Sequence, residues 1–185
     1  ISNGDAALDR VTPERKRQLA RFISESYLSE GNAAKAREYY EIFGEGAKEM
    51  DDADLFYAGS VMYSTGDYKG AVDKFSRMTS RADSIGQIAN YEMAYSYIKT
   101  GNKVAAMDAF KAASSQPWNE DIREDAHFNY AKLSFDLNNN PSVFNEYMKA
   151  YPGKKKDDII YGYIALACLY GHDYAAAVDA YSNID

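Results

Sequence analysis

The sequence predicts an all-α protein built from repeated helical hairpins. Three segments of the chain align without gaps, and they begin at Gly31, Gly66 and Gly101, at a constant interval of 35 residues. In each segment an alanine follows five residues after the glycine, and an aromatic residue follows nine residues after it. A fixed period of this length is typical of arrays of supersecondary units. Only four prolines interrupt the chain, which favours helix within each unit.

Each repeat is interpreted as two helices joined by a tight turn. The glycine supplies the left-handed backbone that ends the first helix, and the Asn or Asp after it can cap the second helix. Small residues on both helices allow a close approach, and the aromatic residue lies on the same face as the alanine. The small residues are Ala36, Ala71 and Ala106 on the second helices and Gly59, Ala94, Ala131 and Ala165 on the first helices, and the aromatic residues predicted to lie in the core are Tyr40, Phe75, Phe110 and Tyr181.

Two weaker copies complete the pattern. Residues 172–181 repeat it with His172 in the glycine position, and residues 138–147 repeat it with Val143 in the alanine position. Thr12 and Pro13 predict the start of the first helix, as a cap followed by proline at the first helical position. We therefore expect an N-terminal extension over 1–12 and an array over 13–185, with approximate repeats at 17–51, 52–86, 87–121, 124–157 and 158–185.

The order of small residue, Gly-Asp/Asn turn, Ala and Phe/Tyr resembles the tetratricopeptide repeat (TPR) family over residues 13–185. The resemblance implies a right-handed α-solenoid of about five helix-turn-helix repeats. The chain departs from the family in two ways. The closing proline is mostly absent, and the tryptophan of the first helix is replaced by Ala20, Leu55, Asn90, His127 and Tyr161.

In this family the first helices line a concave groove that binds a segment of another protein. Aromatic side chains on a rigid concave surface are frequent anchors of protein interfaces. The alternative is that these aromatic residues pack between neighbouring hairpins, as many of the 17 tyrosines must. The groove positions carried over from the family are Arg21, Glu25, Phe56, Tyr63, Tyr91, Tyr95, Lys99, Phe128, Lys132, Phe135 and Leu166, with Leu28, Ser60, Ile98, Ile159 and Tyr170 beside them.

One subtype of the family grips the C-terminal tails of chaperones with a clamp of Lys and Asn side chains. The corresponding positions here are Arg21 and Glu25, Phe56 and Ser60, and Tyr91 and Tyr95. Only the isolated Asn129 and Lys132 are similar to that clamp. The sequence therefore does not favour a chaperone tail as the partner.

The composition argues against two other classes of partner. The net charge is −7, whereas binding to nucleic acid needs a cationic surface. No apolar run approaches the roughly 20 residues that span a bilayer, so we expect no direct membrane insertion. The basic clusters Arg15–Arg17 and Lys154–Lys156 are interpreted as solvated surface.

The sequence contains no constellation of catalytic residues, so we predict that the protein is not an enzyme and needs no cofactor or metal. His127 and His172 are far apart in the sequence, and Cys168 occupies a packing position. The acidic stretch 49–54 lacks the spacing of a calcium loop and suits the start of a helix. Trp118 lies in a loop between repeats and is interpreted as a local packing plug in preference to a partner anchor.

The predicted function is that of a protein-interaction scaffold. The Tyr-rich helices and Asn-rich turns resemble TPR proteins of the Gram-negative cell envelope, which implies a periplasmic or outer-membrane-associated location and a role in envelope assembly or coordination. A cytosolic adaptor that recognises a peptide is the alternative, and a homo-oligomer stacked through the ends of the array is a third. The chain begins at Ile1 and ends at Asp185 without a polar cap, so we expect it to be a processed or excised piece.

Overall fold

The computed structural model describes residues 8, 10–44, 50–78, 81–138, 140, 142–152 and 158–184. These described residues form ten helices and no strand, which confirms the all-α prediction. The chain divides into two compact units, Ile1–Ser80 and Arg81–Asp185.

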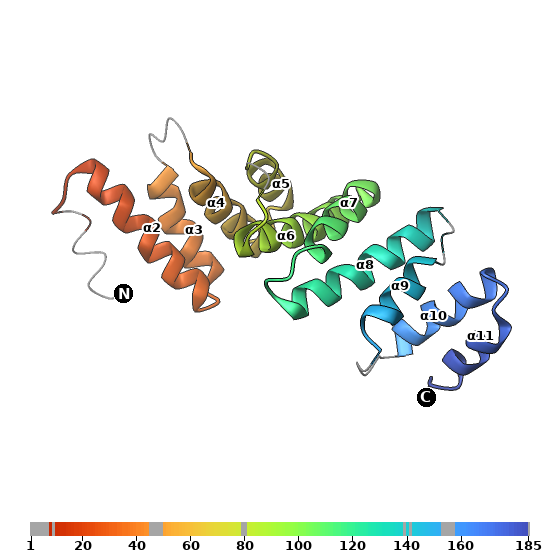
Figure 1. Cartoon of the computed structure of the whole chain (residues 1–185). Coiled ribbons are helices and arrows are strands. Elements are labelled where there is room, and N and C mark those ends of the chain that lie inside the picture. Colours follow the sequence, from red (N-terminus) through yellow and green to blue (C-terminus); the bar gives the residue numbers. More distant parts are fainter. Residues whose placement is uncertain are drawn as a thin grey trace. The chain divides into compact units, whose positions relative to one another are not determined.

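The unit Ile1–Ser80 contains two helical hairpins (Figure 1). Each helix packs against the next one along the chain, and α2 also contacts α4 directly. The first helices of the two hairpins are therefore neighbours. The bounds are α2 (Pro13–Ser29), α3 (Ala33–Gly44), α4 (Asp52–Ser64) and α5 (Tyr68–Ser76).

The unit Arg81–Asp185 contains three hairpins. Its central first helix, α8, contacts α7 and α9 and also α6 and α10, so three first helices follow one another in space. Figure 1 shows α8 between the other two hairpins of this unit. The bounds are α6 (Ser84–Thr100), α7 (Lys103–Ser114), α8 (Glu120–Asn138), α9 (Ser142–Ala150), α10 (Asp158–Tyr170) and α11 (Tyr174–Tyr181).

The predicted turn chemistry is confirmed in four of the five repeats, whereas Asn138, in the glycine position of the fourth, is the last residue of helix α8. Gly31, Gly66 and Gly101 have φ values of 76°, 82° and 83°, and His172 has φ of 62°, so all four adopt the left-handed conformation. The residue after each of them accepts a hydrogen bond from the backbone N–H three residues further on, which caps the second helix. These capping residues are Asn32, Asp67, Asn102 and Asp173.

Two predicted helix starts are confirmed, with one correction. Helix α2 begins at Pro13, but the side chain of Thr12 makes no capping hydrogen bond. The fixed φ of proline already suits the first turn, so this helix can begin without a side-chain cap. Helix α4 begins at Asp52, after Asp51, whose carboxylate accepts from the N–H of Asp54 at 2.8 Å.

Small residues lie where the two helices of a hairpin approach most closely. Ala94, Ala131 and Ala165 are fully buried. At Gly59 an added Cβ would lie 2.4 Å from the Phe75 ring, so this position requires glycine. In the first hairpin the buried Ser24 takes this position, and its hydroxyl donates to the carbonyl of Ala36.

The aromatic core prediction is confirmed for Phe75 and Phe110, which are 4% and 0% exposed. Tyr40 is only partly buried, and the prediction is wrong for Tyr181, which is 45% exposed. The physical reason is that α11 contacts α10 alone among the described helices, so no further helix covers its outer face.

Some predictions fall outside the described residues. These are the basic cluster Lys154–Lys156, Glu49 in the acidic stretch, and most of the extension 1–12. Leu8 of that extension is described, and it is buried against the core between α2 and α3. Among the described helices, none has the length and apolar character that crossing a bilayer requires.

Candidate partner-binding surface

In the unit Ile1–Ser80, the predicted groove residues Arg21 and Glu25 form a charged link between α2 and α4. The Arg21 guanidinium pairs through Nε with Glu25 Oε1 at 3.0 Å and through Nη1 with Asp54 Oδ1. All three side chains are partly exposed, so these ion pairs contribute modestly to stability. Their main effect is to fix the orientation of Arg21 on this face.

The groove residues of α4 are held largely by their own hairpin. The Phe56 ring lies 6.4 Å from the Phe75 ring, and the Tyr63 ring lies 6.0 Å from the Tyr68 ring. Ser60 is buried. On α4 the packing alternative therefore accounts for much of the predicted groove set.

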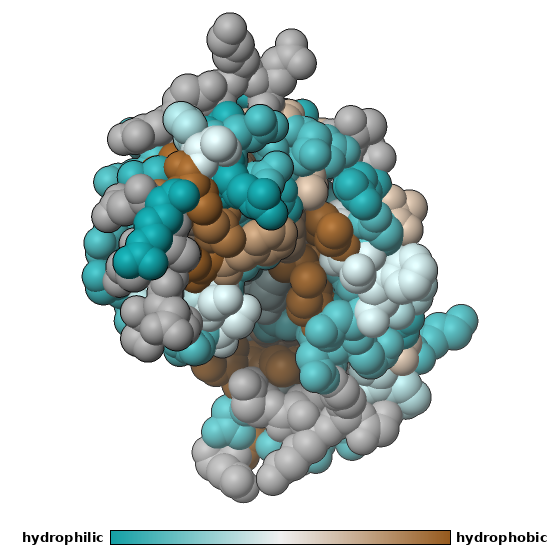
Figure 2. Space-filling model, turned by 90° about the vertical axis from the view of Figure 1, so that its left-hand side faces the viewer, coloured by the Kyte–Doolittle hydropathy of each residue, from teal (hydrophilic) through white to brown (hydrophobic). Residues whose placement is uncertain are grey.

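Exposed apolar surface in this unit centres on Phe22, which is 62% exposed and is the most exposed large hydrophobic side chain among its described residues. It borders a hollow of about 480 Å³ that is lined by charges of both signs. Figure 2 shows hydrophobic patches between the hydrophilic residues that make up most of that view. The other residues that line the hollow are Glu14, Arg17, Gln18, Arg21, Phe43, Asp51 and Asp54.

In the unit Arg81–Asp185, the groove tyrosines of α6 are bonded to α8. The phenols of Tyr91 and Tyr95 donate to Asp125 Oδ2 at 2.8 and 2.7 Å. The amide of Asn129 donates to the same oxygen at 3.0 Å and to the Tyr95 phenol at 3.2 Å. Four side chains from two first helices therefore form one polar cluster, which we call the Asp125 cluster.

The electrostatics of the Asp125 cluster favour neutral phenols. Burial, and secondarily the bond to Asp125, raises the pKa of Tyr95 to about 12. The same causes, in the same order, raise the pKa of Tyr91. Both phenols therefore remain hydrogen-bond donors throughout the physiological pH range.

Two predicted groove residues on α8 serve the core as well as the surface. The Phe128 ring packs against Phe144 and Tyr147 of α9, with ring centroids 6.2 and 5.8 Å away. Phe135 is 8% exposed and packs against Phe144 and Tyr170. Phe135 therefore offers a partner very little surface.

The other predicted positions are accessible. Lys132 places its ammonium 5.0 Å from the centre of the Tyr163 ring, and Lys99 is exposed near the end of α6. Three apolar side chains extend this surface on α10. Ile159, Leu166 and Tyr170 are 64%, 41% and 63% exposed.

Two side chains with potential for chemistry, Cys168 and His127, lie in packed environments. Cys168 is buried, and burial raises the pKa of its thiol, which disfavours the nucleophilic thiolate. The His127 ring packs between Tyr147 and Tyr151, and burial lowers its pKa. Among the described residues, no group of three His, Cys, Asp or Glu side chains is arranged to hold a metal ion.

Comparison with protein-family models gave no match, and comparison with curated proteins also gave none.

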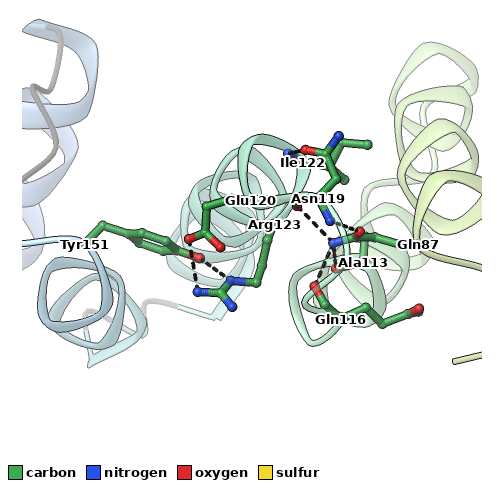
Figure 3. A network of polar contacts seen from close by, with 8 residues as sticks. All are labelled: Gln87, Ala113, Gln116, Asn119, Glu120, Ile122, Arg123 and Tyr151. Carbon is green, nitrogen blue, oxygen red and sulfur yellow. Dashed lines mark hydrogen bonds and ion pairs between the residues drawn. The ribbon is translucent and has the colours of Figure 1, made fainter. Parts of the chain in front are cut away.

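A second polar cluster braces the connection between α7 and α8 (Figure 3). The fully buried amide of Gln87 donates to the carbonyls of Gln116 at 2.7 Å and Asn119 at 3.2 Å, and it accepts from the Asn119 N–H at 2.7 Å. The adjacent Trp118 is 58% exposed, so it is not the packing plug that the sequence suggested. Its indole N–H donates to the Ala82 carbonyl at 3.2 Å.

Sequence reasoning missed Asp125, Tyr163 and Gln87. The available signal for Asp125 was its interval: it lies 34 residues after Tyr91, which is about one repeat. A carboxylate one repeat after a groove tyrosine occupies the facing position on the next first helix. No comparable signal marks Gln87, whose partners are backbone atoms.

Proposed function

We propose that this chain is a TPR-type right-handed α-solenoid that acts as a protein-interaction scaffold and binds a partner segment along its first helices. The observation that carries the proposal is the surface of α6, α8 and α10. Consecutive first helices there present aromatic and apolar side chains beside the Asp125 cluster. Such a mixture of anchors and oriented polar groups is what protein interfaces use.

The proposal assigns no reaction to the chain. The thiol of Cys168 and the imidazole of His127 are committed to packing, as their burial and pKa directions indicate. The tyrosines of the Asp125 cluster have raised pKa values, which disfavours them as general bases near neutral pH.

The proposed setting is the Gram-negative cell envelope, with a periplasmic or outer-membrane-associated location and a role in envelope assembly or coordination. This part of the proposal rests on the resemblance of the Tyr-rich helices and Asn-rich turns to those of TPR proteins of the Gram-negative cell envelope. A cytosolic adaptor that recognises a peptide is the alternative, and the origin of the captured partner decides between the two.

Site-specific photo-crosslinking tests the proposal. A benzophenone amino acid is placed at Tyr170, which is 63% exposed on a first helix, or at Val104, which is 58% exposed on the second helix α7. Each protein is irradiated in source-cell lysate that has been separated into envelope and soluble fractions. The two positions are similarly exposed, and one samples a first helix whereas the other samples a second helix.

We expect a discrete crosslinked partner from Tyr170 and none from Val104, with the partner in the envelope fraction. A partner from the soluble fraction alone would replace the envelope setting by the cytosolic one. Equal crosslinking from both positions, or crosslinking from Val104 alone, would contradict binding on the first helices.

Self-association is a second candidate function, favoured by one observation. Tyr174, Val178 and Tyr181 follow one another at helical spacing on α11 and are 62%, 69% and 45% exposed. Light scattering over a range of concentrations should then show a rising mass that Val178→Glu abolishes. A constant monomer mass would reject this candidate.

A further inference from the structure

We propose that the Asp125 cluster is the recognition site for a cationic side chain, preferably an arginine, of the partner segment. This inference rests on the proposed function, because it assumes that the partner lies along the first helices. It adds the chemistry that the partner must carry at one position.

The hydrogen bonds of the Asp125 carboxylate involve only one of its two oxygens. Oδ2 accepts from Tyr91, Tyr95 and Asn129, whereas Oδ1 accepts from no described residue. An ionised carboxylate offers about four acceptor positions on its two oxygens. The three bonds therefore fix the orientation of the group and leave one oxygen available to a donor from outside.

The charge of Asp125 is not compensated within the described part of the chain. Its three donors are neutral, and no described lysine or arginine pairs with it. The cations nearby on α8 are engaged elsewhere. Arg123 pairs with Glu120 and lies over the Tyr151 ring, and Lys132 lies over the Tyr163 ring. A partly buried anion held by neutral donors attracts a cation more strongly than an anion in open water does.

The surroundings of Asp125 favour arginine in particular. The rings of Tyr91 and Tyr95 lie edge to face, with centroids 5.0 Å apart, and Tyr95 is braced from behind by the fully buried Phe110. A guanidinium can stack on an aromatic ring while its N–H groups reach a carboxylate. The cluster is also preorganised, because its hydrogen bonds exist before any partner arrives.

The test is selection from a library of random dodecapeptides displayed on phage. The library is panned against the wild-type chain, Asp125→Asn and the control Asp136→Asn. Asparagine can still accept from the two phenols, so Asp125→Asn removes the charge with little change of shape. Asp136 lies on the same helix and is exposed, so the control makes the same chemical change outside the cluster.

We expect arginine or lysine to be enriched at one fixed position by the wild-type chain and by Asp136→Asn, but not by Asp125→Asn. In the best peptide, replacing that arginine with the neutral analogue citrulline should weaken the Kd for the wild type about tenfold. For Asp125→Asn the same replacement should change the Kd by less than about twofold.

The outcomes separate this inference from the proposed function. Peptides that bind with no preference for a cation, or equally well with citrulline, would overturn the inference and leave the scaffold proposal intact. Failure to retain any peptide on the wild-type chain would remove both.

A second measurement needs no Asp125 variant. The arginine peptide, but not its citrulline analogue, should shift the NMR signals of the Tyr91 and Tyr95 rings, assigned with Tyr91→Phe and Tyr95→Phe. Equal shifts from both peptides would overturn the inference, even if Asp125→Asn failed to fold.

Discussion

The phenol of Tyr91 donates to the carboxylate of Asp125 at 2.8 Å across an interval of 34 residues. Tyr95 and Asn129 are joined across the same interval, and Arg21 and Asp54 across 33 residues. Each bond joins a first helix to the next first helix within one unit. The interval of about one repeat therefore appears in the side-chain bonds as well as in the turns.

The Asp125 cluster predicts a loss of stability in alkali. The unfolded phenols ionise near pH 10, whereas the folded Tyr95 has a pKa of about 12 because of burial and its bond to Asp125. Below pH 10 both states are protonated and the contribution is complete. Between about pH 10 and 12 the unfolded state binds fewer protons, so the free energy of unfolding falls. Urea titrations on either side of pH 10 should show this fall.

Tyr95→Phe should reduce that pH dependence, because it removes one of the two phenols of the cluster whose pKa is raised in the folded state. Tyr174→Phe removes a hydroxyl at a site that is 62% exposed and serves as the control. An unchanged slope in Tyr95→Phe would contradict the assignment of the alkaline loss to this cluster.

Gln87→Leu should destabilise the unit Arg81–Asp185 by about 2–4 kcal/mol, because it removes the hydrogen bonds of the fully buried Gln87 amide to the N–H and carbonyl of Asn119 and to the carbonyl of Gln116. The single tryptophan, Trp118, lies next to Asn119 and reports this region by fluorescence during urea unfolding. Gln18→Leu, at an exposed position of α2, should change the midpoint little. Equal midpoints for both variants would mean that the Gln87 bonds contribute no net stability.

Two glycines in helices should respond in opposite directions to alanine. Gly59→Ala should destabilise the chain by about 1–3 kcal/mol, because its Cβ would overlap the buried Phe75 ring. Gly162→Ala should stabilise it by about 0.5–1 kcal/mol, since the added Cβ meets nothing within 4 Å and alanine favours helix. Thermal unfolding followed by circular dichroism measures both. A stabilising Gly59→Ala would refute the close contact at Gly59, and a destabilising Gly162→Ala would refute the open space at Gly162.

Equivalent aromatic positions should differ in energy according to what covers them. Phe110→Ala should cost about 3–5 kcal/mol, because the ring is fully buried between α6 and α7. Tyr181→Ala should cost less than about 1 kcal/mol, because 45% of this side chain is already exposed. A large loss at Tyr181 would indicate that something covers α11 in solution, and concentration dependence of the loss would identify self-association.

The sequence predicted the hairpins well because their signals are local. A left-handed glycine, a capping Asn or Asp and small residues at fixed offsets each act within a few residues of the turn, and Gly66 with Asp67 illustrates all of this at one place. The same pattern predicted a core position for Tyr181, and this was wrong. The repeat period places the residue on a helix face, but it does not say whether another helix covers that face.

The binding surface was less predictable because its properties depend on neighbouring helices. Tyr91 and Tyr95 were placed on the groove side by analogy, but their bonding to Asp125 depends on how α6 faces α8. Phe135 was placed there too, yet the packing of Phe144 and Tyr170 around it leaves it 8% exposed. The spacing of residues along one helix does not determine which side chains of a neighbouring helix contact them.

The Gln87 amide has a consequence for how the loop before α8 tolerates change. All the atoms that it bonds in residues 113–119 are backbone atoms, so it specifies the path of this segment without specifying side chains. Substitutions at the exposed Ser115 should therefore leave the path intact, whereas adding or removing one residue would disrupt it. This stretch is free to diverge in composition but not in length, which suits it to carry an engineered epitope or a fluorescent label by replacement rather than by insertion.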